Sequence, residues 1–251
     1  MPSRFSKLEI TALALYLIWT LCGLITVSLK INHETIDNIN FKAFSERLFH
    51  LPLHKASLHW LLRWGDTIMI FLAALNAHLL AIRHWGVSQA RRWAALVCII
   101  TGSVESCGTL TGIPFGHYVY TDVLGMKLMG VLPLAIPLAW LALLTSCLML
   151  IRGLFPYASP ISQTVATATL VTFIDWILEP YAVEIRGYWR WIDTEGNAVD
   201  FIPIQNYLSW WVLSATLVFF SPREILKSAD PRPWLIPGAM VLLFITARLF
   251  T

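Results

Sequence analysis

The sequence predicts an all-α integral membrane protein, a polytopic bundle of about seven transmembrane helices. Hydrophobic residues make up 57% of the 251 residues and charged residues 13%, whereas soluble domains have about 25% charged residues. The mean hydropathy is +0.65. A spanning helix needs about 20 mostly apolar residues, and seven stretches of the chain approach that length. Little sequence lies outside them, so residues 1–251 are expected to form a single integral membrane domain.

The seven predicted spans follow one another through the whole chain. They cover roughly residues 9–29, 60–82, 93–114, 128–151, 162–183, 206–221 and 234–250. The last two are the shortest. The first is a long apolar run without a small-residue cleavage site after it, so we expect a retained span rather than a removed signal peptide.

Prolines interrupt the fourth and fifth predicted spans. Pro133 and Pro137 are expected to kink the fourth helix and to free backbone carbonyls. Pro180 is expected to end or bend the fifth helix directly after Glu179. Irregular backbone inside a membrane persists only where it is buried in protein or lines a cavity. We therefore expect irregular backbone next to some of the acids in the predicted spans, such as Glu179.

The distribution of charged residues gives information on the orientation of the protein in the membrane and on its binding partners. Lys and Arg divide nine to eight between the two sides, and the short loops at 83–92 and 222–233 favour a cytoplasmic N-terminus. The predicted location is the cytoplasmic (inner) membrane. A net charge of +3 spread over these loops does not indicate nucleic-acid binding. The four cysteines lie in apolar spans without CxxC spacing, which favours buried thiols over disulfides or metal ligands.

Four acids lie in predicted spans, namely Asp66, Glu105, Asp175 and Glu179. A charged group there costs about 2.5–3.5 kcal/mol and raises a functional hypothesis. Asp66 follows Arg63 by three residues, a spacing that allows a structural ion pair on one helix face. Glu105 has no basic residue within a helical turn, so burial favours its neutral form. Glu105 could donate a proton or only hydrogen-bond between helices, and both readings stay open.

Asp175 and Glu179 are four residues apart in "TFIDWILEPYAV" and therefore share one helix face. Two neighbouring carboxyl groups in a low dielectric rarely both ionise, so one of them is expected to keep its proton. A protonated acid beside a carboxylate is the usual basis of acid–base catalysis. Alternatively, the Asp175–Glu179 pair could bind a cation or face water near the helix end.

Aromatic and polar residues gather between the spans. The stretch "TGIPFGHYVYT" contains His117, Tyr118 and Tyr120, and its glycines and proline predict a turn. Two further segments, "GYWRWID" (187–193) and "PIQNYLSWW" (203–211), repeat the aromatic pattern. Their rings could line a pocket and stabilise a passing cation, or lie in the aromatic belt at the membrane interface.

Three histidines, His50, His54 and His59, have a spacing that resembles metal ligands. Membrane di-iron oxygenases need many more histidines in clustered pairs, and Pro52 interrupts this segment. A loop with surface histidines is the preferred interpretation, so no metal ligand and no metal cofactor are predicted.

Several of these motifs together resemble a known family. The segments "TGIPFGHYVYTDVLG", "IPLAW", "DWILEP", "GYWRW" and "PIQNY" occur in the order that is typical of membrane carotenoid biosynthesis proteins of the bisanhydrobacterioruberin hydratase or carotenoid 1,2-hydratase type. The resemblance covers about residues 105–211, and TG-x-PFG-x-Y-x-YT is its specific part. Ser209 stands where the family pattern has glycine, which bears on local helix packing more than on chemistry.

The resemblance implies a hydro-lyase that adds water to the terminal double bond of an acyclic carotenoid and forms a tertiary alcohol. In that reaction Asp175 or Glu179 would donate the proton while its partner orients water, and Glu105 is the next candidate donor. No cofactor is expected. Besides the lipid bilayer, other carotenoid biosynthesis enzymes are candidate partners. The residues assigned to the pocket and to the water are His117, Tyr118, Tyr120, Trp189, Trp191 and Asn206.

Other functions would use some of the same residues. A membrane isoprenoid cyclase also begins with alkene protonation, so the same acids would serve it. A prenyltransferase would need a DDxxD-like motif for magnesium and diphosphate, and the sequence has none. A proton-coupled transporter suits buried acids and broken helices, but no inverted repeat relates the two halves. A non-catalytic assembly partner would not need paired acids.

Overall fold

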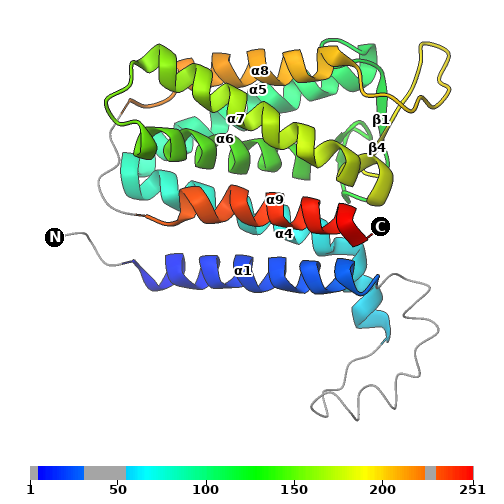
Figure 1. The fold of residues 1–251 in the computed structure, drawn as a ribbon, viewed down its shortest axis with the longest axis horizontal. Coiled ribbons are helices and arrows are strands. Elements are labelled where there is room, and N and C mark those ends of the chain that lie inside the picture. The colour runs from blue at the N-terminus through cyan, green and yellow to red at the C-terminus, as the bar shows by residue number, and fades with distance from the viewer. Residues whose placement is uncertain (1–4, 31–54, 224–229, 251) are drawn as a thin grey trace.

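Seven α-helices lie side by side in the part of the chain that the computed structural model describes, residues 5–30, 55–223 and 230–250 (Figure 1). The predicted all-α helical bundle is confirmed. The helices are α1 Lys7–Ser28, α4 Lys55–Trp85, α5 Val87–Thr111, α6 Ala135–Leu154, α7 Pro160–Pro180, α8 Ile204–Phe219 and α9 Arg232–Phe250. Each of them overlaps one of the apolar stretches found in the sequence.

Six of the described helices are long and apolar enough to cross a membrane, which makes the chain an integral membrane protein. The exception is α8. Its 16 residues extend about 24 Å at about 1.5 Å per residue, less than the hydrocarbon core of about 30 Å. The sequence predicted about seven spans, and six of the described helices reach spanning length.

Helix α6 is the centre of the bundle and packs against α4, α5, α7 and α9. Fifteen of its 20 residues are buried, as its continuous apolar sequence requires. The helix begins at Ala135, so Pro133 lies before it and Pro137 lies in its first turn, where a missing N–H costs little. The expectation that Pro133 kinks this helix is wrong, because the helix starts later than residue 128.

Helix α7 does not stop at Pro180. It continues as a π-helix over Tyr181–Ile185, and the chain then turns at Gly187, whose φ is +62°. Single π-turns are rare and frequent at functional sites. Pro180 therefore marks a change of helical pitch, and Glu179 lies directly before this irregular turn, as the sequence indicated.

The end of the bundle opposite the N-terminus carries the short strands of the described chain (Figure 1). Strand β1 Tyr118–Tyr120 pairs antiparallel with β4 Trp189–Trp191, and β2 Lys127–Leu128 pairs antiparallel with β3 Leu132–Pro133. Sequence analysis predicted turns here and no strand pairing. The reason is that α6 and α7 separate β1 from β4 along the chain, so no local pattern marks them as partners.

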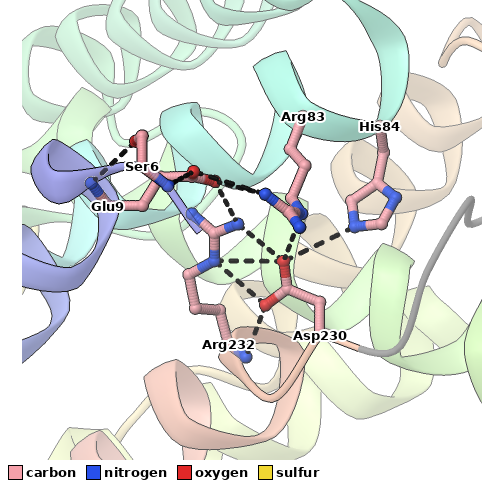
Figure 2. Close-up of polar contacts among 6 residues, drawn as sticks. All are labelled: Ser6, Glu9, Arg83, His84, Asp230 and Arg232. Atoms are coloured by element: carbon pink, nitrogen blue, oxygen red, sulfur yellow. Dashed lines mark hydrogen bonds and ion pairs between the residues drawn. The ribbon is translucent and has the colours of Figure 1, made fainter. Parts of the chain in front are cut away.

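At the N-terminal end, a buried network of charged side chains joins α1, α4 and α9 (Figure 2). Arg232 Nη2 donates to Glu9 Oε1 at 2.8 Å and to Asp230 Oδ2 at 2.6 Å. Arg83 Nη1 lies 3.3 Å from Glu9 Oε2, and His84 Nε2 lies 3.6 Å from Asp230 Oδ2. Because two arginines face two carboxylates, the network balances most of its own formal charge.

No local sequence pattern marks this network, since its members come from both ends of the chain. Burial alone would raise the pKa of Asp230, but its contacts with His84 and Arg232 outweigh burial and hold the pKa below the usual range for aspartate. Asp230 therefore stays ionised at neutral pH. Removing one partner from such a buried network leaves an uncompensated charge, which is strongly destabilising.

Asp66 on α4 forms an ion pair, but not with the partner that the spacing predicted. Arg186 Nε donates to Asp66 Oδ2 at 2.8 Å, and Arg186 Nη2 contacts the same oxygen. Arg63 donates instead to the Val123 carbonyl at 2.8 Å. The predicted Arg63–Asp66 pair is wrong, because the loop after α5 supplies a carbonyl for Arg63 and the turn after α7 supplies a cation for Asp66.

Replacing Arg232 with methionine should lower stability by about 3–5 kcal/mol, because Glu9 and Asp230 lose the cation that they share. The matched control is R248M, an exposed arginine in the same helix, which should change stability little. Thermal unfolding of the purified protein in detergent measures both. Equal unfolding temperatures for the two variants would contradict a stabilising role for the network.

Candidate active site

Three carboxyl groups are buried within the spans, close to the end of the bundle that carries β1 and β4. Glu105 lies in the last turns of α5, and Asp175 and Glu179 lie in the last turns of α7. Their exposed fractions are 4%, 0% and 1%. No ion pair within the described residues involves any of the three. Their hydrogen bonds to neutral donors must therefore compensate for lost water.

Glu105 accepts hydrogen bonds from three neutral donors. Its Oε2 accepts from the Tyr118 hydroxyl at 2.8 Å and from the Tyr120 hydroxyl at 2.7 Å. Its Oε1 accepts from Trp140 Nε1 at 2.8 Å. Burial first, and the Glu105 carboxylate second, raise the pKa of both phenols above the usual range for tyrosine, so both hydroxyls remain donors. The three donors satisfy both carboxyl oxygens of Glu105 within the protein.

Asp175 and Glu179 share one amide. Asn206 Nδ2 donates to Glu179 Oε1 at 2.9 Å and to Asp175 Oδ2 at 3.3 Å, which places both carboxyl groups on the same side of α7. Glu179 Oε2 also accepts from Trp191 Nε1 at 3.2 Å. Asp175 Oδ1 is buried and has no hydrogen-bond partner among the described residues. Asn206 comes from the first turn of α8, so the short helix α8 positions the pair.

The β1–β4 pair forms one wall of the site. Its register aligns Tyr118 with Trp191 and Tyr120 with Trp189, and these four residues lie on one face because side chains alternate along a strand. The ring centroids are 5.4 Å apart in the first pair and 6.1 Å apart in the second. Arg190, between the tryptophans, is exposed. The alternation in "YVY" and "WRW" is therefore that of two strands with one inward face.

A cavity of about 70 Å³ lies between this wall and the helices. One water needs about 10–15 Å³ by the same measure, so the cavity has room for several waters or a small branched hydrocarbon group. Glu105, Glu179 and Asn206 line it, and Asp175 does not. Nine aromatic side chains also line it: Phe115, Tyr118, Tyr120, Trp140, Tyr188, Trp189, Trp191, Trp210 and Phe244. The structure thus brings together seven of the nine predicted site residues at the cavity surface, and Asp175 lies directly behind it.

Two tryptophans of the cavity wall were not predicted as site residues. Trp140 on α6 stacks on Trp210 of α8 with ring centroids 3.7 Å apart and planes 14° apart. Trp140 is also the indole that donates to Glu105. Both residues lie in segments that sequence analysis quoted, "IPLAW" and "PIQNYLSWW". The position of Trp140 inside an apolar span could have indicated its role, because a buried indole N–H needs a hydrogen-bond partner.

His117 is the predicted site residue that the structure places away from the cavity. It is exposed, and it lies on the opposite side of the chain from Tyr118, as strand alternation requires. Its imidazole packs over Gly112, where a Cβ would lie 2.6 Å from Cε1. Gly112 has φ +75°, which any other residue adopts at a cost. His117 therefore packs against the turn and does not contact the cavity.

Ser209, which departs from the family pattern, has a local role. Its hydroxyl donates to the Pro114 carbonyl at 2.8 Å and ties α8 to the turn before β1. Glycine at this position could not make this hydrogen bond, so the departure from the family pattern adds one contact between α8 and the turn.

The structure says little about the histidine segment. His50 and His54 lie outside the described residues, and His59 lies on α4. Within the described ranges, no three His, Cys, Asp or Glu side chains come together as metal ligands would.

Gly108 on α5 provides the space in which the aromatic wall packs. A Cβ there would lie 2.7 Å from Phe115 Cδ2 and 3.0 Å from the Tyr118 hydroxyl. G108A should displace these rings and lower stability by about 1–3 kcal/mol. The control is G65A on α4, where nothing lies within 4 Å of the added atom. Thermal unfolding and tryptophan fluorescence test both, and equal behaviour of the two variants would argue against tight packing at Gly108.

Comparisons with known proteins agree with the motifs quoted above. The carotenoid biosynthesis protein family matches residues 65–250, which is 186 of the 251 residues. A bisanhydrobacterioruberin hydratase of Haloarcula japonica is 30% identical over 132 residues, and the match covers 51% of this chain and 44% of that protein. No solved structure matches the chain. The chain belongs to the carotenoid biosynthesis protein family.

Proposed function

We propose that this protein is a carotenoid hydratase of the cytoplasmic membrane, which adds water to the terminal double bond of an acyclic carotenoid. The observation that carries the proposal is Glu179. This carboxyl group is buried inside a membrane span, lines an aromatic cavity, and accepts hydrogen bonds from Asn206 and Trp191. The family assignment and the similarity to a hydratase support the same reaction.

The three buried carboxyl groups differ in their surroundings, which supports different roles. All three cannot be ionised together in a low dielectric without a cation beside them. We assign the negative charge to Glu105, because it accepts three hydrogen bonds. Asp175 and Glu179 share one amide and are the natural pair to retain a proton between them. We assign the proton to Glu179 at the start of the reaction, because Glu179 faces the cavity and Asp175 does not.

In the proposed first step, Glu179 transfers its proton to the less substituted carbon of the terminal double bond. The π electrons form the new C–H bond, and the other alkene carbon becomes a tertiary carbocation. Trp189, Trp191 and the stacked Trp140–Trp210 pair line the cavity, and their rings would stabilise that cation. The Glu105 carboxylate supplies the opposite charge on the cavity wall.

In the second step, a water oxygen forms a bond to the cationic carbon and then releases a proton. The Glu179 carboxylate, which has just lost its proton, would accept it, so the catalyst returns to its starting state. The product is a tertiary alcohol, heavier than the substrate by one water. Asn206 would orient the carboxyl group of Glu179, and Asp175 would act as a positioning residue through the same amide.

The reaction is tested first by product mass. A bacterial host that accumulates acyclic carotenes should form a pigment heavier by one water when it expresses this protein, and the oxygen should come from labelled water. Mass spectrometry of extracted pigments measures both. A pigment of unchanged mass with an altered absorption spectrum would favour a cyclase, which begins with the same protonation, and would refute hydration.

The role of Glu179 is tested with a matched pair of substitutions. E179Q should lower the hydration rate at least about 100-fold, the lower range for loss of a general acid. E184Q makes the same change at an exposed position one helical turn later and should keep the rate. D175N should have a smaller effect than E179Q, because Asp175 lies behind the cavity. Full turnover in E179Q would exclude Glu179 as the proton donor.

A further inference from the structure

A second cavity lies at the opposite end of the bundle from the candidate active site. Its volume is about 190 Å³, and it lies between the end of α6, the start of α7 and the end of α8. Two arginines, Arg152 and Arg223, line it together with Gln163 and Thr164. None of these residues takes part in the proposed hydration, so this cavity needs a separate explanation.

Arg152 is held in a fixed orientation. Its Nη2 donates to the Ser221 hydroxyl at 2.7 Å, and its Nη1 donates to the Pro222 carbonyl. The Ser221 hydroxyl in turn donates to the Val218 carbonyl at 2.6 Å. A guanidinium group has five N–H donors, so the end of α8 positions Arg152 and leaves further N–H groups for a ligand.

No carboxylate among the described residues forms an ion pair with the arginines of this cavity, Arg152 and Arg223. Two like charges that line one cavity repel each other, and a bound anion would remove that cost. Guanidinium groups match phosphate oxygens in geometry and bind them through paired, charge-assisted hydrogen bonds.

Exposed aromatic residues surround this end of the bundle. Phe155 and Tyr157 precede α7, and Phe219 and Phe220 end α8, with exposed fractions from 54% to 100%. Tryptophan and tyrosine concentrate at the depth of lipid headgroups, and the fully exposed Tyr157 supports that depth for this end of the bundle. The loop charges favour the cytoplasmic side for this end, and basic pockets between helices on that side bind anionic headgroups.

We propose that the cavity between α6, α7 and α8 binds the phosphate group of an anionic membrane phospholipid. Arg152 supplies an oriented guanidinium group from α6, and Arg223 supplies a second positive charge from the segment after α8. The acyl chains would extend along the apolar helix surfaces into the bilayer. This site is independent of the proposed hydration and holds whether or not the protein is a hydratase.

The test uses the purified full chain in neutral detergent. Thermal unfolding is followed while phosphatidylglycerol, phosphatidylcholine or inorganic phosphate is added. Phosphatidylglycerol should raise the unfolding temperature at the lowest concentration of the three. R223Q, a substitution of an exposed side chain, should weaken the apparent affinity for phosphatidylglycerol at least about tenfold, since a charge-assisted contact is lost. R92Q, an exposed arginine at the same end of the bundle, is the charge-matched control.

The outcomes separate the alternatives. Loss of the lipid effect in R223Q but not in R92Q supports the site. An equal lipid effect in the two variants would overturn it, because the response would then depend on net charge alone. If inorganic phosphate stabilises the protein as well as phosphatidylglycerol does, the cavity is a site for free phosphate and the lipid assignment is overturned. R152Q is not used as the main test, because Arg152 also holds the end of α8.

Discussion

The hydrogen bonds that Glu105 accepts hold the candidate site together. Tyr118 and Tyr120 come from β1 and Trp140 from α6, so one buried carboxyl group on α5 joins three elements. β1 in turn holds β4 through main-chain pairing, and β4 carries the tryptophan that donates to Glu179. A buried carboxylate that lost its donors would remain unsatisfied at a high cost. The aromatic wall therefore has one arrangement in which every polar group near Glu105 is paired.

Carboxyl groups of the same chemical type have different surroundings in this site. Glu105 accepts from three neutral donors, whereas Asp175 and Glu179 share the two hydrogens of one amide. This difference is the general means by which two carboxyl groups become an acid and a base in one site. The aromatic rings add to it, because their faces can stabilise positive charge. Such a site suits a reaction that passes through a carbocation.

The two ends of the bundle meet different physical demands. At the N-terminal end, Arg83 and Arg232 are neutralised by Glu9 and Asp230, which fastens α1 and α9 to α4 (Figure 2). Arg152, at the same end, faces a cavity without a carboxylate from the described protein. At the other end, Asp66 is paired with Arg186, and the three buried carboxyl groups of the candidate site have neutral donors instead of cations.

The sequence by itself determined the features that depend on neighbouring residues. Apolar length sets the helices, and the four-residue spacing of Asp175 and Glu179 sets their common face. Partners distant in the chain were decided only by the tertiary structure. It paired Asp66 with Arg186 and β1 with β4, and it placed Trp140 against Glu105. The reason is physical: helix periodicity is local, whereas a buried polar group bonds to whichever donor packing brings within about 3 Å.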